Sequence, residues 1–291
     1  MDKKQQVVVK DNALINAAYT LDLVEQRLIL MSTVRGREEG QGITADKPLL
    51  VRAEDYAEQF KVTRQTAYAA LKDAVSGLFN RYFTYEQLTK RGNVEVVKSR
   101  WVSQVSYVEH EAMVSIVFAP AVVPMITRLE REFTRYDLEQ VSSLTSTYAV
   151  RLYELLISWR STGKTPAIEL GDLRARLGVE EGQYKLMHHF KAKVLDRAIN
   201  QVNEHTDITA SYEQHKRGRT ITGFSFTLTL KNAARDPNTI DLLTGTTDAE
   251  HARPKRQRIT RQQAEGMAQP GEEWPALIKR LAPDFFITNL N

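Results

Sequence analysis

Three polar side chains, Lys193, Arg197 and Asn200, recur at i, i+4 and i+7, which places them on one side of a helix. Lysine and arginine suit guanine edges and phosphates, and asparagine suits adenine edges. The spacing therefore predicts a helix that reads base pairs in duplex DNA, with Lys191 and Gln201 as further candidate contacts. The opposite side of the same helix is apolar: Phe190, Val194, Leu195, Ala198, Ile199 and Val202.

Any surface helix carries polar residues on its outer side, so this reading depends on the elements around it. A basic turn occurs twice in the chain, as "YEQLTKRGN" at 85–93 and "YEQHKRGRT" at 212–220. Gly92 and Gly218 supply the positive φ that a tight hairpin requires. We predict that each turn is a hairpin tip that presents cations to phosphates. The candidate cations are Lys90, Arg91, Lys216, Arg217 and Arg219.

The two turns belong to a longer internal repeat. "VRAEDYAEQFKV" at 51–62 aligns with "IELGDLRARLGV" at 168–179, and an apolar helical stripe then recurs at 70–78 and 194–202. The change in offset from 117 to 124 residues implies a second turn that is seven residues longer. A helix that ends in a glycine stop signal precedes each copy, at 21–36 and 147–163.

Each copy therefore reads as helix, short strand, helix, turn, helix and a strand pair closed by the basic turn. This order predicts an α+β chain of two tandem winged helices, each a helix-turn-helix with a β-hairpin wing. We assign residues 1–135 to the first domain and 136–232 to the second.

The first copy offers a less charged DNA-contacting surface than the second. Thr63 is a candidate N-cap for its second helix. Lys98 and Arg100, two residues apart in a strand, share one face, although a solvated strand edge would explain them equally well. The candidate DNA contacts of this copy are Arg64, Gln65, Tyr68, Lys72, Lys98 and Arg100.

Composition restricts the other classes of function. The 291 residues include no cysteine and carry a formal net charge of +4, and the N-terminus lacks the apolar run of a signal peptide. No stretch approaches the roughly 20 apolar residues of a membrane span. We expect a cytoplasmic protein that does not associate with membranes.

No motif indicates an enzyme. "STGKT" at 161–165 lacks the first glycine of a phosphate loop and follows a helix, so it reads as a helix stop. His188 and His189 have no further ligand at metal spacing. A replication nickase would need a His-hydrophobic-His strand, which is absent. We expect no cofactor, no metal and no catalytic activity.

The second copy resembles a known family. "RLYELL", "LRARLGV", the "YK…FK…VL…AI…N…TDI" frame and "GFSF" are similar to the second winged helix of the Rep-type replication initiators of iteron-bearing, theta-replicating plasmids. "NALINAAYTLDLVEQRLILMSTV" resembles the opening helix of that family, and the likeness covers roughly residues 7–232.

The resemblance implies a monomer that binds direct repeats of duplex DNA at an origin, through both domains, and recruits the host initiator and helicase. It also implies a dimer that binds an inverted repeat at its own promoter, in equilibrium with the monomer, and the involvement of host chaperones. The helix at 191–203 would be the main recognition element, and the first domain would serve as dimer interface or second DNA contact. The Gln201-Val202-Asn203 triplet departs from the Glu-Ile-Asn that is common in the family.

The residues alone leave two alternatives open. A dedicated transcriptional repressor with two winged helices would carry the same DNA-binding chemistry. Residues 233–291 read as a basic linker, with five Arg or Lys and no acid at 251–263, followed by a short helix at 274–281 that would dock on the body or on a partner.

Overall fold

The helices and strands of the repeat are visible in a computed structural model, which describes residues 6–38, 42–127 and 133–231 and four short strands beyond them. The chain divides into two units, Met1–Lys231 and Asn232–Asn291. In the second unit, β12 (Ile240–Asp241) pairs antiparallel with β13 (Thr246–Thr247), and β14 (Gln257–Thr260) pairs parallel with β15 (Phe285–Thr288). The helix predicted at 274–281 and most of the basic stretch lie outside the described residues.

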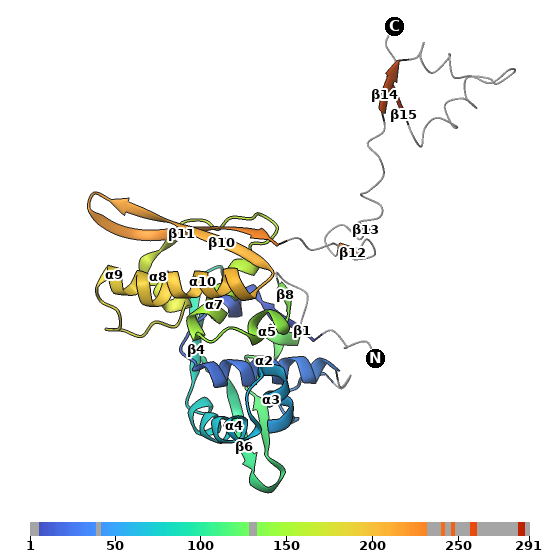
Figure 1. Cartoon of the computed structure of the whole chain (residues 1–291), viewed down its shortest axis with the longest axis vertical. Coiled ribbons are helices and arrows are strands. Elements are labelled where there is room, and N and C mark those ends of the chain that lie inside the picture. The colour runs from blue at the N-terminus through green and yellow to red at the C-terminus, as the bar shows by residue number, and fades with distance from the viewer. Residues whose placement is uncertain are drawn as a thin grey trace, which may run out of the picture. The chain divides into compact units, whose positions relative to one another are not determined.

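The first winged helix has the predicted helix-turn-helix but a different wing (Figure 1). Its short strand β3 pairs with β7, which pairs in turn with β6, so the sheet order is β3-β7-β6. Its wing is therefore β6–β7, and the wing tip is the short 3-10 helix η1. The elements are α2 (Leu23–Glu38), β3 (Leu49–Arg52), α3 (Ala53–Phe60), α4 (Arg64–Leu78), β6 (Val102–Val108), η1 (Glu109–Glu111) and β7 (Met113–Phe118).

The first Lys-Arg-Gly turn closes a separate hairpin, so its assignment as a wing tip is wrong. Strands β4 (Tyr82–Leu88) and β5 (Val94–Arg100) form this hairpin, and β4 pairs on its other side with β2 (Ala18–Tyr19), not with β3. The prediction failed because a basic glycine turn specifies a tight hairpin without specifying the strand beside it. Gly92 does adopt the predicted positive φ, at 80°.

The second winged helix follows the predicted order. Strand β9 pairs with β11, and the ten-residue β10 pairs with β11 from Ile208 to the tip, with one register shift after His215. The predicted recognition helix is longer than expected and contains a π-helical turn, η2. The elements are α7 (Thr147–Ile157), β9 (Ile168–Glu169), α8 (Leu170–Arg176), α9 (Met187–Phe190), η2 (Lys191–Leu195), α10 (Asp196–His205), β10 (Ile208–Arg217) and β11 (Thr220–Leu230).

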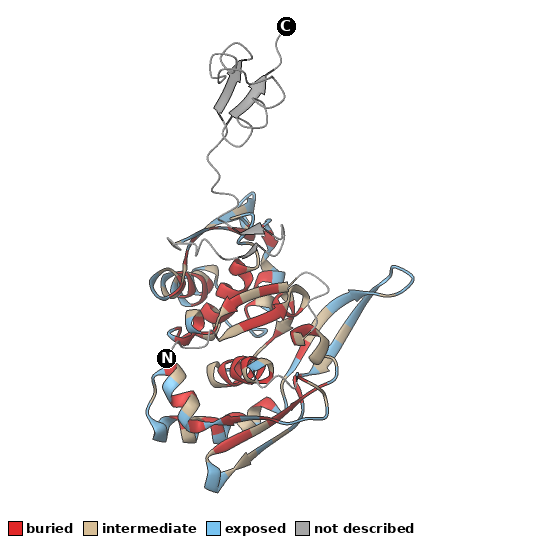
Figure 2. Cartoon of the chain, turned by 90° about the vertical axis from the view of Figure 1, so that its right-hand side faces the viewer, coloured by how far each residue is buried: buried red, intermediate tan, exposed pale blue. Residues whose placement is uncertain are grey.

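The two winged helices share one continuous apolar core within Met1–Lys231, with α2 and α7 among its most buried helices (Figure 2). Strand β8 runs through the predicted boundary at residue 135 and pairs with β1 near the N-terminus. The remaining elements of this unit are β1 (Val7–Asp11), α1 (Asn12–Asn16), α5 (Val123–Thr127), β8 (Phe133–Asp137) and α6 (Glu139–Ser142).

The predicted glycine stop is wrong for the first long helix. Helix α2 continues through Gly36 to Glu38. A Cβ on Gly36 would lie 2.4 Å from a side-chain carbon of Ile43, so this glycine allows close packing rather than ending the helix. In the second copy α7 ends at Ile157, and Gly163 adopts a φ of 67° in the following turn, consistent with a loop at "STGKT".

Candidate nucleic-acid interface

The recognition helix of the second copy has the two faces that its spacing predicted. Phe190, Val194, Leu195, Ala198 and Val202 have no exposed surface, and Ile199 is also buried. Lys193, Arg197 and Asn200 are all exposed. No hydrogen bond or ion pair ties these three side chains to any part of the chain that the structure describes. They are thus free to meet a ligand, on a helix that is fixed by its opposite face.

Hydrogen bonds at its C-terminal end tie this helix to its neighbours. The Gln201 carboxamide oxygen accepts from the backbone N–H groups of Thr145 (2.9 Å) and Ser146 (3.2 Å), just before α7. The Asn203 carboxamide bonds both the N–H and the C=O of Ala210 in β10. Gln201 was predicted as a DNA contact; in the structure its amide satisfies backbone groups ahead of α7.

The π-helical turn places Lys191 beside the wing. Its Nζ lies 3.4 Å from Gln214 Oε1 and 5.8 Å from the centroid of the Tyr212 ring. The hydroxyl of Tyr212 donates to Asp196 at 2.6 Å, and burial together with this carboxylate raises the pKa of Tyr212 well above its usual range. Lys191 therefore covers apolar surface with its stem and is half-buried, which explains how a lysine fits within the apolar arc.

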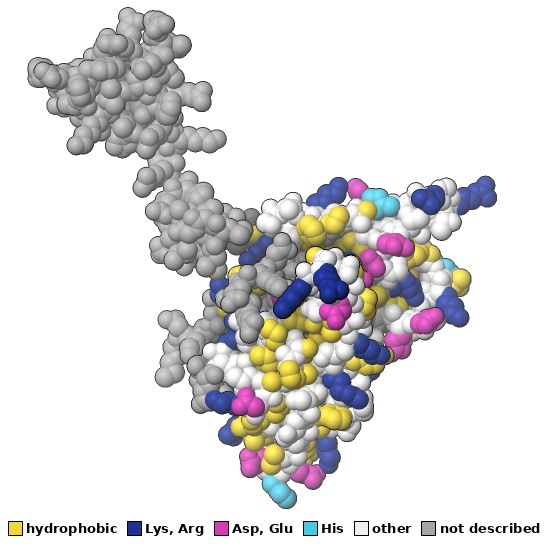
Figure 3. Space-filling model, turned by 180° about the vertical axis from the view of Figure 1, so that it is seen from behind, with side chains coloured by type: hydrophobic (Ala, Val, Ile, Leu, Met, Phe, Trp, Pro, Cys, Tyr) yellow, Lys and Arg dark blue, Asp and Glu magenta, His cyan; other side chains and the backbone are white. Residues whose placement is uncertain are grey.

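The second wing ends in a cluster of free cations. Lys216, Arg217 and Arg219 are exposed around Gly218, whose φ is 63°. Within the described residues none of these three side chains forms an ion pair. Dark blue basic side chains accordingly mark the end of the long β10–β11 hairpin in Figure 3. Such a tip has the chemistry for phosphate contact.

The first wing has the opposite charge. Its tip is Glu109-His110-Glu111, and all three residues are exposed. The tip lies at the lower end of the view in Figure 3. Glu109 also reaches back to α4, where its carboxylate lies 2.8 Å from Lys72 Nζ. This hydrogen-bonded ion pair raises the pKa of Lys72 and lowers that of Glu109. An acidic tip would repel DNA phosphates where the second wing would attract them.

The candidates on α4 therefore divide into two groups. Thr63 caps the helix as predicted, accepting from Thr66 N–H at 3.1 Å, and leaves Arg64 and Gln65 exposed on the first turn. Tyr68 and Lys72, further along the helix, contact the first wing: Tyr68 packs edge-on against Tyr107, with the ring centroids 5.5 Å apart.

The remaining candidates lie on the extra β4–β5 hairpin. Lys90 and Arg91 are exposed at its tip. Lys98 and Arg100 do share a face, as predicted, but both have local partners. Lys98 Nζ lies 3.6 Å from the centroid of the Tyr82 ring, and Arg100 donates to the backbone oxygen of Phe79.

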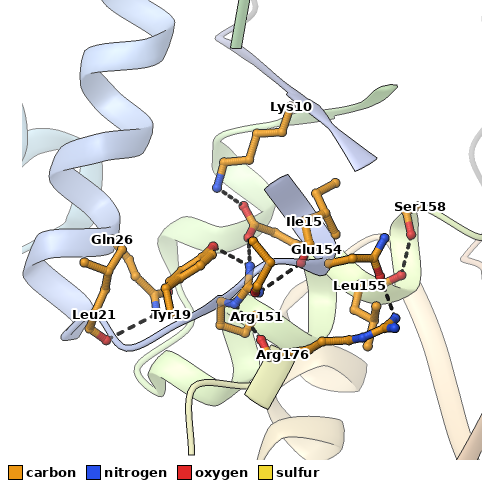
Figure 4. A network of polar contacts seen from close by, with 12 residues as sticks. Lys10, Ile15, Tyr19, Leu21, Gln26, Arg151, Glu154, Leu155, Ser158 and Arg176 are labelled. Carbon is orange, nitrogen blue, oxygen red and sulfur yellow. Dashed lines mark hydrogen bonds and ion pairs between the residues drawn. The ribbon is translucent and has the colours of Figure 1, made fainter. Parts of the chain in front are cut away.

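A buried polar network, which sequence reasoning missed, joins the N-terminal strands to α7 (Figure 4). Glu154 accepts from Lys10 Nζ (2.5 Å), from the Tyr136 hydroxyl (2.5 Å) and from Arg151 (3.2 Å). Arg151 also donates to the hydroxyl of Tyr19. Burial acts to raise the pKa of Glu154, but the two cations outweigh it and hold that pKa below its usual value. A lone Lys10 in an N-terminal strand gives no sequence signal of a partner 144 residues away.

The described residues contain no group of three or more His, Asp or Glu side chains placed to hold a metal ion. The rings of His188 and His189 contact each other at an angle of 60°, with centroids 4.1 Å apart. No described helix is both long and apolar enough to cross a membrane.

Comparison with known families agrees with this architecture. A family model described as "Initiator Replication protein, WH1" matches residues 7–157, and a second, "Initiator Rep protein, WH2", matches residues 169–228. The chain belongs to the initiator replication protein family. The resemblance seen in the sequence and the prediction of two tandem winged helices are thereby confirmed, and the domains are called WH1 and WH2 below.

Individual relatives extend this result. An uncharacterised 27.6 kDa protein of Escherichia coli is 28% identical over 230 residues, which cover 75% of this chain and 95% of that protein. A replication initiation protein of Escherichia coli is 24% identical over 201 residues, 67% of this chain and 62% of that protein. The crystal structure of the Pi initiator protein in complex with iteron DNA matches with a TM-score of 0.61 at 22% identity, over 79% of this chain and all of that one. That likeness shows the fold.

Proposed function

We propose that this initiator binds direct repeats of duplex DNA, iterons, at a plasmid origin and thereby starts replication. The observation that carries the proposal is the free ridge of Lys193, Arg197 and Asn200 on a helix whose other face is fully buried. A recognition helix needs both features: a packed face that fixes its position, and unpaired donors and acceptors that can contact base edges. The similar Pi initiator, crystallised with iteron DNA, supports this choice of ligand.

The two winged helices contribute different parts of the interface in this proposal. WH2 reads sequence through Arg197 and Asn200, with Lys193 beside them, and its wing grips the backbone through Lys216, Arg217 and Arg219. WH1 makes a second backbone contact through Arg64 and Gln65 at the start of α4. Two modules within one compact unit raise the effective concentration of the second contact.

The basic β4–β5 hairpin and the wing-covered residues take secondary roles. Lys90 and Arg91 remain candidates for phosphate contact at the hairpin tip. Tyr68 and Lys72 would contact DNA only after exchange of their bonds to Glu109 and its neighbours. Gln201 and Lys191 position the recognition helix in this proposal, because their polar groups already have partners.

We further propose the regulatory cycle of the family for this chain: a monomer on the direct repeats and a dimer, formed through WH1, that represses its own promoter at an inverted repeat. Host initiator, helicase and chaperones would act with it in the bacterial cytoplasm. No catalytic step is part of the proposal.

Footprinting of the full chain on the DNA upstream and downstream of its own gene, at defined salt, tests the proposal. Protection of tandem direct repeats by the monomer is the expected result. Protection of an inverted repeat alone, by a dimer, would refute the initiator function and leave a dedicated repressor. Absence of any preference over scrambled DNA would refute both.

A further inference from the structure

Exposed side chains of the recognition helix also occur ahead of Lys193. Leu186 is the N-cap residue of α9, with an extended backbone, and His189 lies in the first turn of α9, before the π-helical turn η2. The Leu186 side chain is 57% exposed, and His189 is exposed as well. These two exposed side chains therefore stand at the N-terminal end of the helix that carries Lys193, Arg197 and Asn200.

The loop ahead of the helix holds these two residues in place. It is the turn that is longer in the second copy, and it uses a positive φ at Gly178, at Gly182 and, exceptionally for a non-glycine residue, at Tyr184 (44°). A non-glycine residue in this region is costly and persists where its surroundings hold it.

Contacts from α7 and α8 provide that support. The Arg174 guanidinium donates to the backbone oxygens of Gln183 and Tyr184 and lies 4.9 Å from the centroid of the Phe190 ring. The Tyr184 ring packs edge-on against Tyr148, with centroids 6.1 Å apart. The start of the recognition helix is thus fixed from two sides.

The two imidazoles at this end have no hydrogen-bonding partner within the described residues. The rings of His188 and His189 contact each other at an angle of 60°, with centroids 4.1 Å apart. In a helix-turn-helix it is the N-terminal residues of the recognition helix that contact base edges. The exposed Leu186 side chain and the His189 imidazole, which has no hydrogen bond within the described residues, are therefore available to a ligand at that end.

We propose that Leu186 and His189 are specificity-determining residues that read base edges in the major groove. His189 donates a hydrogen bond to a guanine N7, and the Leu186 methyl groups pack against the C5-methyl of a thymine, which are groups that these bases present in the major groove. The inference rests on the proposed function, since it requires WH2 to enter duplex DNA.

Base analogues test the two contacts separately in the full chain. The probe is a duplex with one copy of the repeat found by footprinting, in which deoxyuridine replaces each thymine in turn, or 7-deazaguanine each guanine in turn. Deoxyuridine removes only the C5-methyl group, and 7-deazaguanine removes only the N7 acceptor. The expected result is a loss of roughly fivefold or more in affinity at one thymine and at one guanine. Leu186→Ala should abolish the effect at that thymine, and His189→Ala the effect at that guanine.

Two matched variants control for the loss of an exposed side chain of the same type. Leu88→Ala removes a leucine that is 71% exposed on the β4–β5 hairpin, and His205→Ala removes the histidine at the far end of the same helix. Both should keep the analogue profile of the unsubstituted chain.

The outcomes separate this inference from the proposed function. Analogue profiles of Leu186→Ala and His189→Ala that match the controls would overturn the inference while the repeat is still bound. A weakening that is equal on the repeat and on scrambled DNA would overturn it too, because it indicates phosphate contact. An unsubstituted chain that does not prefer the repeat would instead refute the proposed function, and the inference with it.

Discussion

Neutralising the tip of the second wing should flatten the salt dependence of DNA binding. Lys216, Arg217 and Arg219 are exposed and unpaired within the described residues, so each can neutralise one phosphate. Each phosphate contact contributes about −0.9 to the slope of log K against log salt on duplex DNA. The triple variant K216Q/R217Q/R219Q should therefore have a slope shallower by about 2.7. Between 50 and 200 mM salt, its affinity should fall roughly 40-fold less than that of the unsubstituted chain.

Fluorescence anisotropy with the repeat and with scrambled duplex, at several salt concentrations, measures both slopes. Because phosphate contacts carry no sequence information directly, the ratio of the two affinities should change little. The triple variant K47Q/R52Q/K164Q removes the same charge from exposed cations outside the proposed interface and should keep the steeper slope. An unchanged salt slope in the wing variant would show that the wing does not contact the DNA phosphates. A changed preference for the repeat would mean that the wing reads bases.

Four further substitutions test the rest of the interface and the buried network that supports it. Arg197→Ala and Asn200→Ala should each cost about 1–3 kcal/mol on the repeat and much less on scrambled DNA in the same titration; equal losses on both would contradict base reading. Glu109→Gln should release Lys72 and steepen the salt slope by up to about 0.9, whereas an unaltered slope would show that α4 stays away from DNA. Lys10→Met should lower the free energy of unfolding in urea by about 3–5 kcal/mol, because it removes one partner of a buried ion pair. A loss below about 1 kcal/mol would show that Arg151 and Tyr136 alone are enough to stabilise the buried Glu154 carboxylate.

The two faces of the recognition helix could be read from the sequence because helical periodicity is a local property. The apolar residues between Phe190 and Val202 form one buried stripe, and Lys193, Arg197 and Asn200 are exposed on the other side. This holds even though the π-helical turn η2 interrupts the regular helical spacing. The stripe tolerates that turn because the apolar residues come in pairs, such as Val194 with Leu195.

Contacts between distant segments could not be predicted in the same way. Both Lys-Arg-Gly turns close a local hairpin. The hairpins differ in the third strand: β11 pairs with β9 of its own winged helix, whereas β4 pairs with β2, and such a pairing depends on residues far along the chain. Gln201 looked like a neighbour of the base-reading ridge, and its amide instead bonds the backbone at Thr145 and Ser146, about 55 residues away. The type of a polar residue does not show whether its side chain already has a hydrogen-bonding partner within the fold.

The opposite charges of the two wing tips favour different roles for WH1 and WH2 in the proposed DNA binding. The WH2 wing adds cations near Lys193, Arg197 and Asn200. In the proposed function these cations attract the phosphates and so favour entry of the recognition helix into the groove. The WH1 wing places the Glu109 carboxylate against Lys72 of α4 and carries Glu111 at the same tip, so in the proposed function DNA contacts only the first turn of that helix, at Arg64 and Gln65. A contact confined to one turn can hold the backbone but has few side chains to inspect bases. Substitutions in WH1 should therefore alter affinity and leave the preferred sequence unchanged, while substitutions along the WH2 ridge alter both.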